Sequence, residues 1–268
     1  MRRGAIGLSL AMLVLSGCAR APAENPATLF PIAWTDSRNC GAPGSCIDLA
    51  VAVDLSVTAF RAIDRPSETP PGACDHFPRC RPAPGSVAAA EFEAIRALLG
   101  ALDSDRVAIT VITFSWLRES SSRAGVVAAL TNDYPAVDTS LSLAEERGFY
   151  GYERWMSQGI DESREELTGL RGAHATPAEN ARKIALVMMA GPPEDLHFPL
   201  GQTVAALERA KRAAISVHFV SVASPGAMAG ADVREAVKQT GGTVSEAADG
   251  GALTTQLVSI GQSLSKGQ

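Results

Sequence analysis

Residues 47–58 read Ile-Asp-Leu-Ala-Val-Ala-Val-Asp-Leu-Ser-Val-Thr. The first seven residues form an apolar run broken only by Asp48, which is typical of a strand buried inside a parallel sheet. Three oxygen-bearing side chains, Asp54, Ser56 and Thr58, follow at the end of the run. Because functional groups of parallel sheets collect where the strands end, these three residues are the first candidates for a functional site.

Along the rest of the chain, similar apolar runs alternate with segments whose apolar residues recur at helical spacing. Runs that predict further strands lie at 106–114, 183–189, 215–222 and 243–245. Apolar residues at helical spacing predict helices at 87–102, 134–146, 155–170, 203–213, 233–239 and 253–264. The stretch 124–130 fits either a short edge strand or a turn of helix. The alternation indicates an α/β fold, with a doubly wound, mainly parallel sheet and helices on both faces.

A proline-rich stretch, 65–86, separates the first predicted strand from the first predicted helix. Its six prolines exclude it from a helix interior, because each removes a backbone donor and clashes with the preceding turn. We expect an insertion loop beside the carboxyl edge of the sheet, where it could set binding specificity. We also expect the fold to survive deletion of this loop.

The composition narrows the classes of function. The chain has 268 residues, of which 46% are hydrophobic, so it can bury a full core and does not resemble a disordered protein. Asp and Glu (29) outnumber Lys and Arg (24), and no long basic run occurs. The charge pattern therefore gives no indication of nucleic-acid binding.

The amino-terminal end resembles the lipobox region of bacterial lipoproteins. A basic start at 1–3 precedes an uncharged run at 4–15, too short to span a bilayer, and Leu-Ser-Gly-Cys follows at 15–18. The resemblance implies a signal peptide at 1–17, cleavage before Cys18 and a covalent lipid on its thiol; an ordinary secretory signal is the alternative. We expect a lipid-anchored tether at 18–39, a domain at 40–268 and a membrane-anchored location in the cell envelope, at the outer membrane or the periplasmic face.

The other four cysteines form two pairs of equal spacing, Cys40 with Cys46 and Cys74 with Cys80. An exported chain favours disulfides. We prefer local pairing, because the strand after Cys46 puts roughly 25 Å between its ends, whereas disulfide Cα atoms lie within about 7 Å of each other. Zinc binding with His76 is the weaker alternative, since zinc cysteines are usually spaced more closely.

Taken in order, these stretches resemble a von Willebrand factor type A (VWA) domain, whose first strand ends in Asp-x-Ser-x-Ser. The segment Asp54-Leu-Ser56-Val-Thr58 matches it with Thr in the third place. The stretch 106–115 resembles the family's second strand, and 130–133 resembles its Leu-Thr-x-Asp segment. The stretch 241–249 resembles its closing strand and the start of its last helix. The likeness covers roughly residues 46–264.

The family's functional feature is a metal-ion-dependent adhesion site, in which oxygen ligands hold Mg²⁺ and leave a position for a partner's carboxylate. By this resemblance Asp54, Ser56 and Thr58 would be metal ligands. Two other positions depart: Ala190 stands where the family has an Asp, and the place of the loop Thr falls near Arg154. A cation held by one carboxylate and two hydroxyls should bind weakly, so we expect Mg²⁺ at most as a weakly held cofactor.

Several alternatives stay open for this site. Asp195 or Glu153 could replace the missing ligands. Arg154 could instead approach Asp54 and put a guanidinium where the family has a metal, because the guanidinium fork suits a carboxylate. A local role is also open, since Asp, Ser and Thr commonly cap the turn that follows a strand.

Other suggestive residues have simpler interpretations. His174 and His197 lack partners at metal-ligand spacing, and His218 falls in the middle of a predicted strand. The polar run 158–171 reads as a solvated helix face. Aromatic residues more often anchor loops, but an interaction patch could come from four of them: Trp116, Tyr150, Tyr152 and Trp155.

Signatures of catalysis are missing from the sequence. It has no Gly-x-Ser-x-Gly elbow, no P-loop, no His-Glu-x-x-His and no glycine-rich dinucleotide turn after the first strand. We therefore expect a non-catalytic, lipid-anchored adhesion or scaffolding module of the cell envelope, whose protein partner contacts the carboxyl edge of the sheet. The alternatives are a structural envelope lipoprotein with a vestigial site, and a metal-dependent adhesion domain with substitute ligands.

Overall fold

The computed structural model describes residues 38–65, 67–74, 79–115, 124–150, 154–170, 179–190, 201–222 and 230–267. The predicted signal peptide, Cys18 and all of the tether before Arg38 lie outside these residues. Among the described residues, no helix combines the length and the hydrophobicity needed to cross a bilayer.

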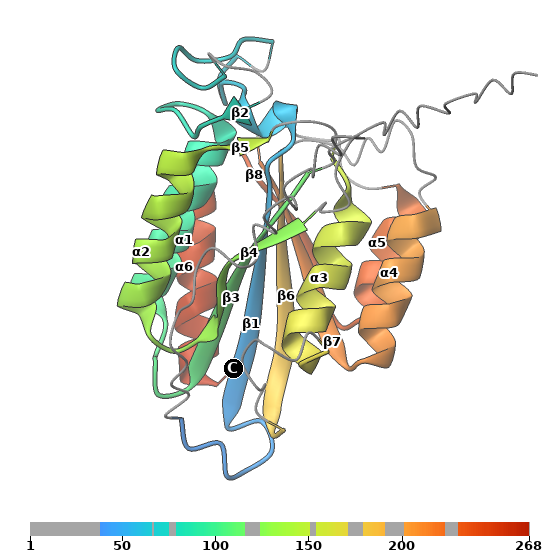
Figure 1. The fold of residues 1–268 in the computed structure, drawn as a ribbon. Coiled ribbons are helices and arrows are strands. Elements are labelled where there is room, and N and C mark those ends of the chain that lie inside the picture. The colour runs from blue at the N-terminus through green and yellow to red at the C-terminus, as the bar shows by residue number, and fades with distance from the viewer. Residues whose placement is uncertain are drawn as a thin grey trace, which may run out of the picture.

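A six-stranded sheet with the order β4-β3-β1-β6-β7-β8 forms the centre of the molecule (Figure 1). Its strands are β1 (Cys46–Asp54), β3 (Val107–Phe114), β4 (Ala124–Thr131), β6 (Ala181–Ala190), β7 (Ile215–Val222) and β8 (Val244–Ala247). Neighbouring strands pair in parallel except for β3 and β4, which are antiparallel. The predicted mainly parallel sheet is confirmed, and the ambiguous stretch 124–130 belongs to the antiparallel edge strand.

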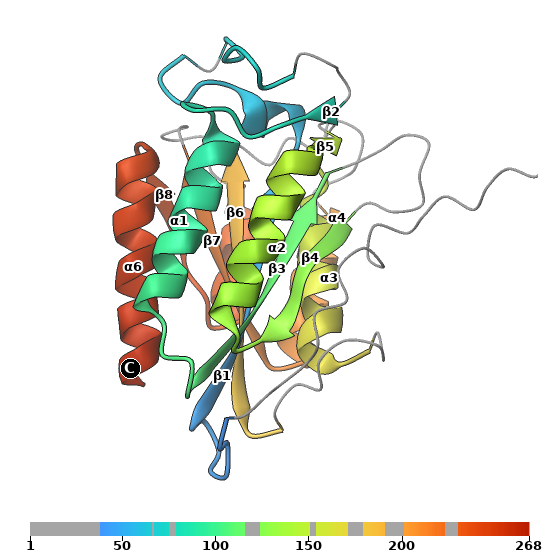
Figure 2. The same ribbon diagram turned by 60° about the vertical axis from the view of Figure 1, so that its left-hand side comes forward.

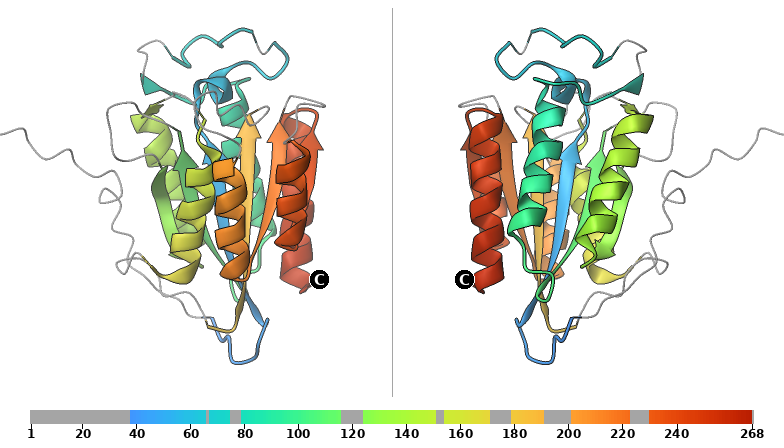
Figure 3. Two further views of the ribbon diagram at one scale, coloured as in Figure 1. Left: turned by 90° about the vertical axis from the view of Figure 1, so that its right-hand side faces the viewer. Right: turned by 90° about the vertical axis from the view of Figure 1, so that its left-hand side faces the viewer.

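Helices cover both faces of this sheet, as Figures 2 and 3 show from several sides. One face carries α1 (Val87–Ala101), α2 (Tyr134–Arg147) and α6 (Gly250–Lys266); the other carries α3 (Met156–Thr168), α4 (Gly201–Arg212) and α5 (Ala231–Gln239). Each predicted helix is present, with ends shifted by up to three residues. The result is the expected three-layer, Rossmann-like α/β arrangement.

The two faces of β1 differ in the size of their side chains. Ile47, Leu49, Val51 and Val53 belong to the apolar cluster that also contains residues of α1 and α6, whereas Ala50 and Ala52 belong to the cluster that contains residues of α3. The small side chains on the second face let α3 lie directly against β1. This close approach places the start of α3 near the carboxyl edge of the sheet.

The proline-rich insertion is part of the core. The short helix η2 (Val57–Phe60) precedes it, and the insertion contains β2 (Arg79–Cys80), which pairs with β5 (Phe149–Tyr150). Ala73, Cys80 and Ala83 are buried in the same apolar cluster as β1. This burial argues against our expectation that the fold survives deletion of the loop, because deletion would open that cluster.

Both predicted disulfides are present, Cys40–Cys46 and Cys74–Cys80. His76, the residue of the zinc alternative, lies outside the described residues. One other prediction is wrong in part: the polar run 158–171 is not simply a solvated face, because Glu162 and Glu166 of α3 are only 4% and 2% exposed.

Candidate functional site

The candidate site lies where two adjacent central strands end. β1 ends at Asp54 and the neighbouring β6 ends at Ala190, and the two strands run in parallel with Val53 opposite Met188. Parallel pairing brings both carboxyl ends to the same edge of the sheet. Asp54, the first of the candidate ligands, and Ala190, which stands where the family has an Asp, therefore lie side by side.

Asp54 is fully buried, and its carboxylate accepts three hydrogen bonds. Oδ1 accepts from the backbone N–H of Ser56 at 2.8 Å. Oδ2 accepts from the backbone N–H of Ala190 at 3.2 Å and from Nε of Arg154. Three donors from three separate segments thus compensate a carboxylate that burial alone would strongly disfavour.

Arg154 stands two residues before α3 and directs its guanidinium into this cluster. Its side chain is 4% exposed, and Nη2 donates to Thr58 Oγ1 at 2.7 Å and to the carbonyl oxygen of Ala190. Of the alternatives that the sequence left open for this site, the approach of Arg154 to Asp54 is present as a contact. Ala190 has no side-chain oxygen, yet it takes part through both its N–H and its C=O.

The donor set does not fit a hard divalent cation. The guanidinium already occupies one oxygen of the only carboxylate in this contact set, and the hydroxyls of Ser56 and Thr58 bond to each other at 2.7 Å. Mg²⁺ requires a near-octahedral shell of oxygens. Across the described residues, no group of three or more His, Cys, Asp or Glu side chains is placed to hold a metal ion. The proposed substitutes Asp195 and Glu153 lie outside these residues.

Glu91 is a buried acid near the site that our sequence interpretation missed. It lies on α1 with an exposed fraction of 0%, and neither carboxyl oxygen has a hydrogen-bond partner among the residues that the structure describes. Burial raises the pKa of Glu91 well above its usual value, the charge of Asp54 raises it further, and the charge of Arg154 lowers it. Helical spacing could have revealed this residue, because Glu91 is four positions before buried Ile95 and four after buried Val87.

Two of the remaining candidates, His218 and Trp155, have described side chains. His218 is half-buried in β7, its Nδ1 lies 3.0 Å from Thr243 Oγ1, and burial together with Arg182 lowers its pKa. Trp155 is 5% exposed and so does not belong to a surface patch. Outside the described residues, or with undescribed side chains, lie His174, His197, Trp116, Tyr150 and Tyr152.

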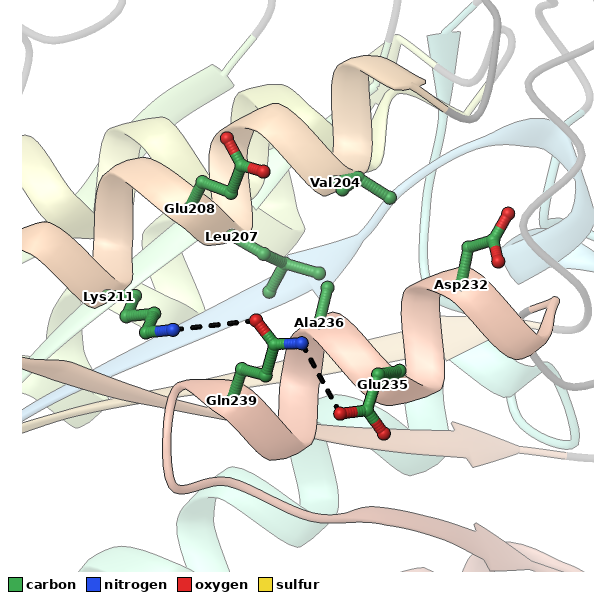
Figure 4. Close-up of a pocket in the computed structure, with 8 residues that line it drawn as sticks. All are labelled: Val204, Leu207, Glu208, Lys211, Asp232, Glu235, Ala236 and Gln239. Atoms are coloured by element: carbon green, nitrogen blue, oxygen red, sulfur yellow. Dashed lines mark hydrogen bonds between the residues drawn. The ribbon is translucent and has the colours of Figure 1, made fainter.

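A shallow pocket lies elsewhere, between α4 and α5 (Figure 4). Leu207 and Ala236 line it together with the exposed acids Glu208, Asp232 and Glu235. None of its lining residues belongs to the Asp54 cluster, so we do not assign the functional site to this pocket.

Comparisons with known proteins agree with this architecture. A scan against protein-family models found no match, and a search of curated proteins found none. Among solved structures, a von Willebrand factor type A protein from Catenulispora acidiphila is similar, with a TM-score of 0.58 and 15% identity over 82% of this chain and 43% of that chain. The chain thus spans less than half of that protein.

Two further structures are similar over nearly the same part of the chain. An aerotolerance-related membrane protein from Bacteroides fragilis NCTC 9343 has a TM-score of 0.53 and 15% identity, covering 82% of this chain and 99% of that one. The pilus adhesin SpaC from Lactobacillus rhamnosus GG has a TM-score of 0.56 and 12% identity, covering 84% of this chain and 31% of that one. The ordered motifs, the strand order and these likenesses together identify the fold as that of a von Willebrand factor type A domain.

Proposed function

We propose that this chain is a lipid-anchored, non-catalytic protein-binding module of the cell envelope, in which the guanidinium of Arg154 stands where a divalent cation would. The observation that carries the proposal is the buried contact of Arg154 with Asp54 at the carboxyl edge of β1. A guanidinium supplies a permanent positive charge and a planar set of donors, which suit a carboxylate. Partner binding therefore needs no bound metal.

Two features support a recognition role over catalysis. Asp54, the carboxylate of the contact set, is engaged by three donors, which suits a positioned structural charge rather than a general base. A pilus adhesin is among the similar structures, which supports adhesion-type binding by this fold. We assign the partner's contact surface to the edge of the sheet above Asp54.

The envelope location rests on the sequence and on the disulfides. Leu-Ser-Gly-Cys at 15–18 supports lipidation of Cys18, and disulfides persist mainly in oxidising, exported compartments. One similar structure is of a membrane protein. A lipid on Cys18 would hold the domain at a membrane without a spanning helix.

The test is capture of partners from envelope extract by the full chain purified in detergent, with Mg²⁺ or with chelator. The site variant is Asp54→Asn. The matched control is Asp161→Asn, the same acid-to-amide change in the ion pair that joins α3 to Arg209 of α4. We expect equal capture in both buffers, loss with Asp54→Asn and retention with Asp161→Asn.

Other results would favour the alternatives. Capture that chelator abolishes, or calorimetric Mg²⁺ binding to the full chain at micromolar concentration, would favour a metal-dependent adhesion site. Absence of any capture that depends on Asp54 would favour a structural envelope lipoprotein with a vestigial site.

A further inference from the structure

The disulfide-closed loop 74–80 is linked to Arg154 through a small sheet. β2 pairs antiparallel with β5, with Cys80 opposite Phe149 and Arg79 opposite Tyr150. Tyr150 is four residues before Arg154, and a chain segment of that length reaches at most about 14 Å. The position of β5 therefore limits where the Arg154 guanidinium can lie.

Both strands of this small sheet are held by buried contacts. Cys80 is fully buried, and the backbone N–H of Arg81 donates to the carbonyl oxygen of Ala73 at 2.6 Å, which closes the neck of the loop beside the disulfide. On the other strand, the ring of Phe149 contacts that of Phe92 in α1, with ring centroids 5.6 Å apart. The strand pairing and the ring contact thus join β2, β5 and α1.

The disulfide has a specific mechanical role in this unit. β2 and β5 have two residues each, and so short a strand pair has little stability of its own. Its geometry must come from the groups that hold its strands, which are the Cys74–Cys80 disulfide on β2 and the Phe149 contact on β5.

We propose that the Cys74–Cys80 disulfide is a brace that positions Arg154: the disulfide holds β2, β2 holds β5, and β5 places the guanidinium against Asp54. The inference deepens the proposed function and rests on it for its biological meaning, because the brace would couple contacts on the insertion to the charge at the site. The structural claim can be tested without lipid, metal or partner.

The test is the rate of phenylglyoxal modification of individual arginines in the full chain in detergent, followed by peptide mass spectrometry. Arg154 (side chain 4% exposed) is the reporter, Arg65 (63%) is the exposed reference, and Arg38 (0%), at the amino end of β1, reports on the intact fold. In the wild-type protein we expect Arg154 to react about ten-fold or more slowly than Arg65, because a buried group reacts only after local opening.

The chain offers a matched control, since both disulfides have a sequence separation of 6. The variant C74S/C80S should bring the Arg154 rate close to that of Arg65 while Arg38 stays protected. The variant C40S/C46S should leave Arg154 protected. Phe149→Ala, which keeps both disulfides, should also raise the Arg154 rate and covers the case in which C74S/C80S does not fold.

Three results would overturn the proposal. Arg154 could stay protected in both C74S/C80S and Phe149→Ala, which would mean that its position does not depend on the brace. The variants C74S/C80S and C40S/C46S could raise the reaction rate of Arg154 equally, which would mean that the Cys74–Cys80 disulfide has no specific role. Arg38 and Arg154 could become reactive together in Phe149→Ala, which would make β5 part of the global fold and not a local positioning device. None of these results bears on partner capture, so the proposed function stands or falls separately.

Discussion

Asp54 and Arg154 compensate each other's charge in a place that water hardly reaches. Removing one member of such a pair leaves an uncompensated buried charge, which costs more than the pair contributes when whole. The contact therefore explains how a carboxylate can be buried at the end of β1. It also makes the two residues energetically dependent on one another.

This dependence can be measured with a double-mutant cycle. Asp54→Asn and Arg154→Met should each lower the free energy of unfolding by about 3–5 kcal/mol, whereas the double variant should lose less than their sum by about 2 kcal/mol or more. Urea denaturation of the four proteins gives the coupling. The more exposed pair Asp161–Arg209 is the control. Changing Asp161 to Asn should lower the free energy of unfolding by about 1 kcal/mol or less. Strict additivity at Asp54 and Arg154 would contradict the pairing.

Glu91 makes the stability depend on pH. Its folded-state pKa is raised above its usual value of 4.5, so the folded protein retains a proton that the unfolded chain loses. Its contribution is fully present below pH 4.5 and is lost as pH rises toward the folded-state pKa, because the unfolded chain then binds fewer protons. Glu91→Gln keeps the shape and removes the titration.

We expect urea denaturation from pH 4 to pH 9 to give similar stabilities for wild type and Glu91→Gln at the acid end. Above pH 4.5 the wild type should fall progressively below the variant. Parallel curves across the whole range would mean that Glu91 does not titrate differently in the folded state, and the raised pKa would be rejected.

At the scale of elements, the position of α3 depends on a glycine. A Cβ built on Gly159 would lie 2.6 Å from Cδ1 of Phe114, whose side chain is buried in β3. No other residue allows the helix to approach so closely without displacing that ring. Since Arg154 lies two residues before α3, this contact also influences the site.

Gly159→Ala should therefore destabilise the fold by about 1–3 kcal/mol through overpacking. Gly100→Ala is the matched control, because Gly100 is also helical and a Cβ there meets nothing within 4 Å. That change should be neutral or stabilising by up to about 1 kcal/mol. Denaturant unfolding of both variants provides the measurement. Equal stabilities would contradict the close-packing argument.

At the scale of the whole molecule, the site and the start of the domain lie at opposite ends of the sheet. Arg38 forms a fully buried ion pair with Asp48 near the amino end of β1, at 2.8 Å, and also donates to the carbonyl oxygen of Ile47 at 2.8 Å. β1 rises about 3.3 Å per residue, so its nine residues separate that end from Asp54 by roughly 26 Å. The first described residue thus lies at the edge of the sheet remote from the proposed binding surface.

The anchor itself gives a prediction at this scale. Cys18→Ser should move the expressed protein from the detergent-rich to the aqueous phase in a detergent-partition assay, because it removes the lipid attachment. Ser16→Ala, which leaves the cysteine in place, should stay in the detergent-rich phase. Retention of Cys18→Ser in that phase would show that something other than a lipid on this cysteine holds the protein.

Much of the fold could be predicted because its signals are local. The apolar run ending at Asp54 and the alternation of strand and helix periods depend only on neighbours along the chain, and they specified the layers and most element boundaries. The same holds for the disulfides, because cysteines six positions apart can meet wherever the backbone turns. The β2–β5 pair gave no such signal, since two-residue strands carry no periodicity.

From the sequence alone we could therefore predict the α/β fold and the disulfide pairs, and find Ala190 and Arg154 at positions where the resemblance expects metal ligands. Folding in three dimensions settles that Arg154 contacts Asp54, that Glu91 is buried with no hydrogen-bond partner in the described part of the chain, and that Arg38 is buried against Asp48. The physical reason is that the environment of a charged group is set by what packs on it from elsewhere in the chain. Periodicity shows which side of an element is buried, but three-dimensional packing decides which charges meet there.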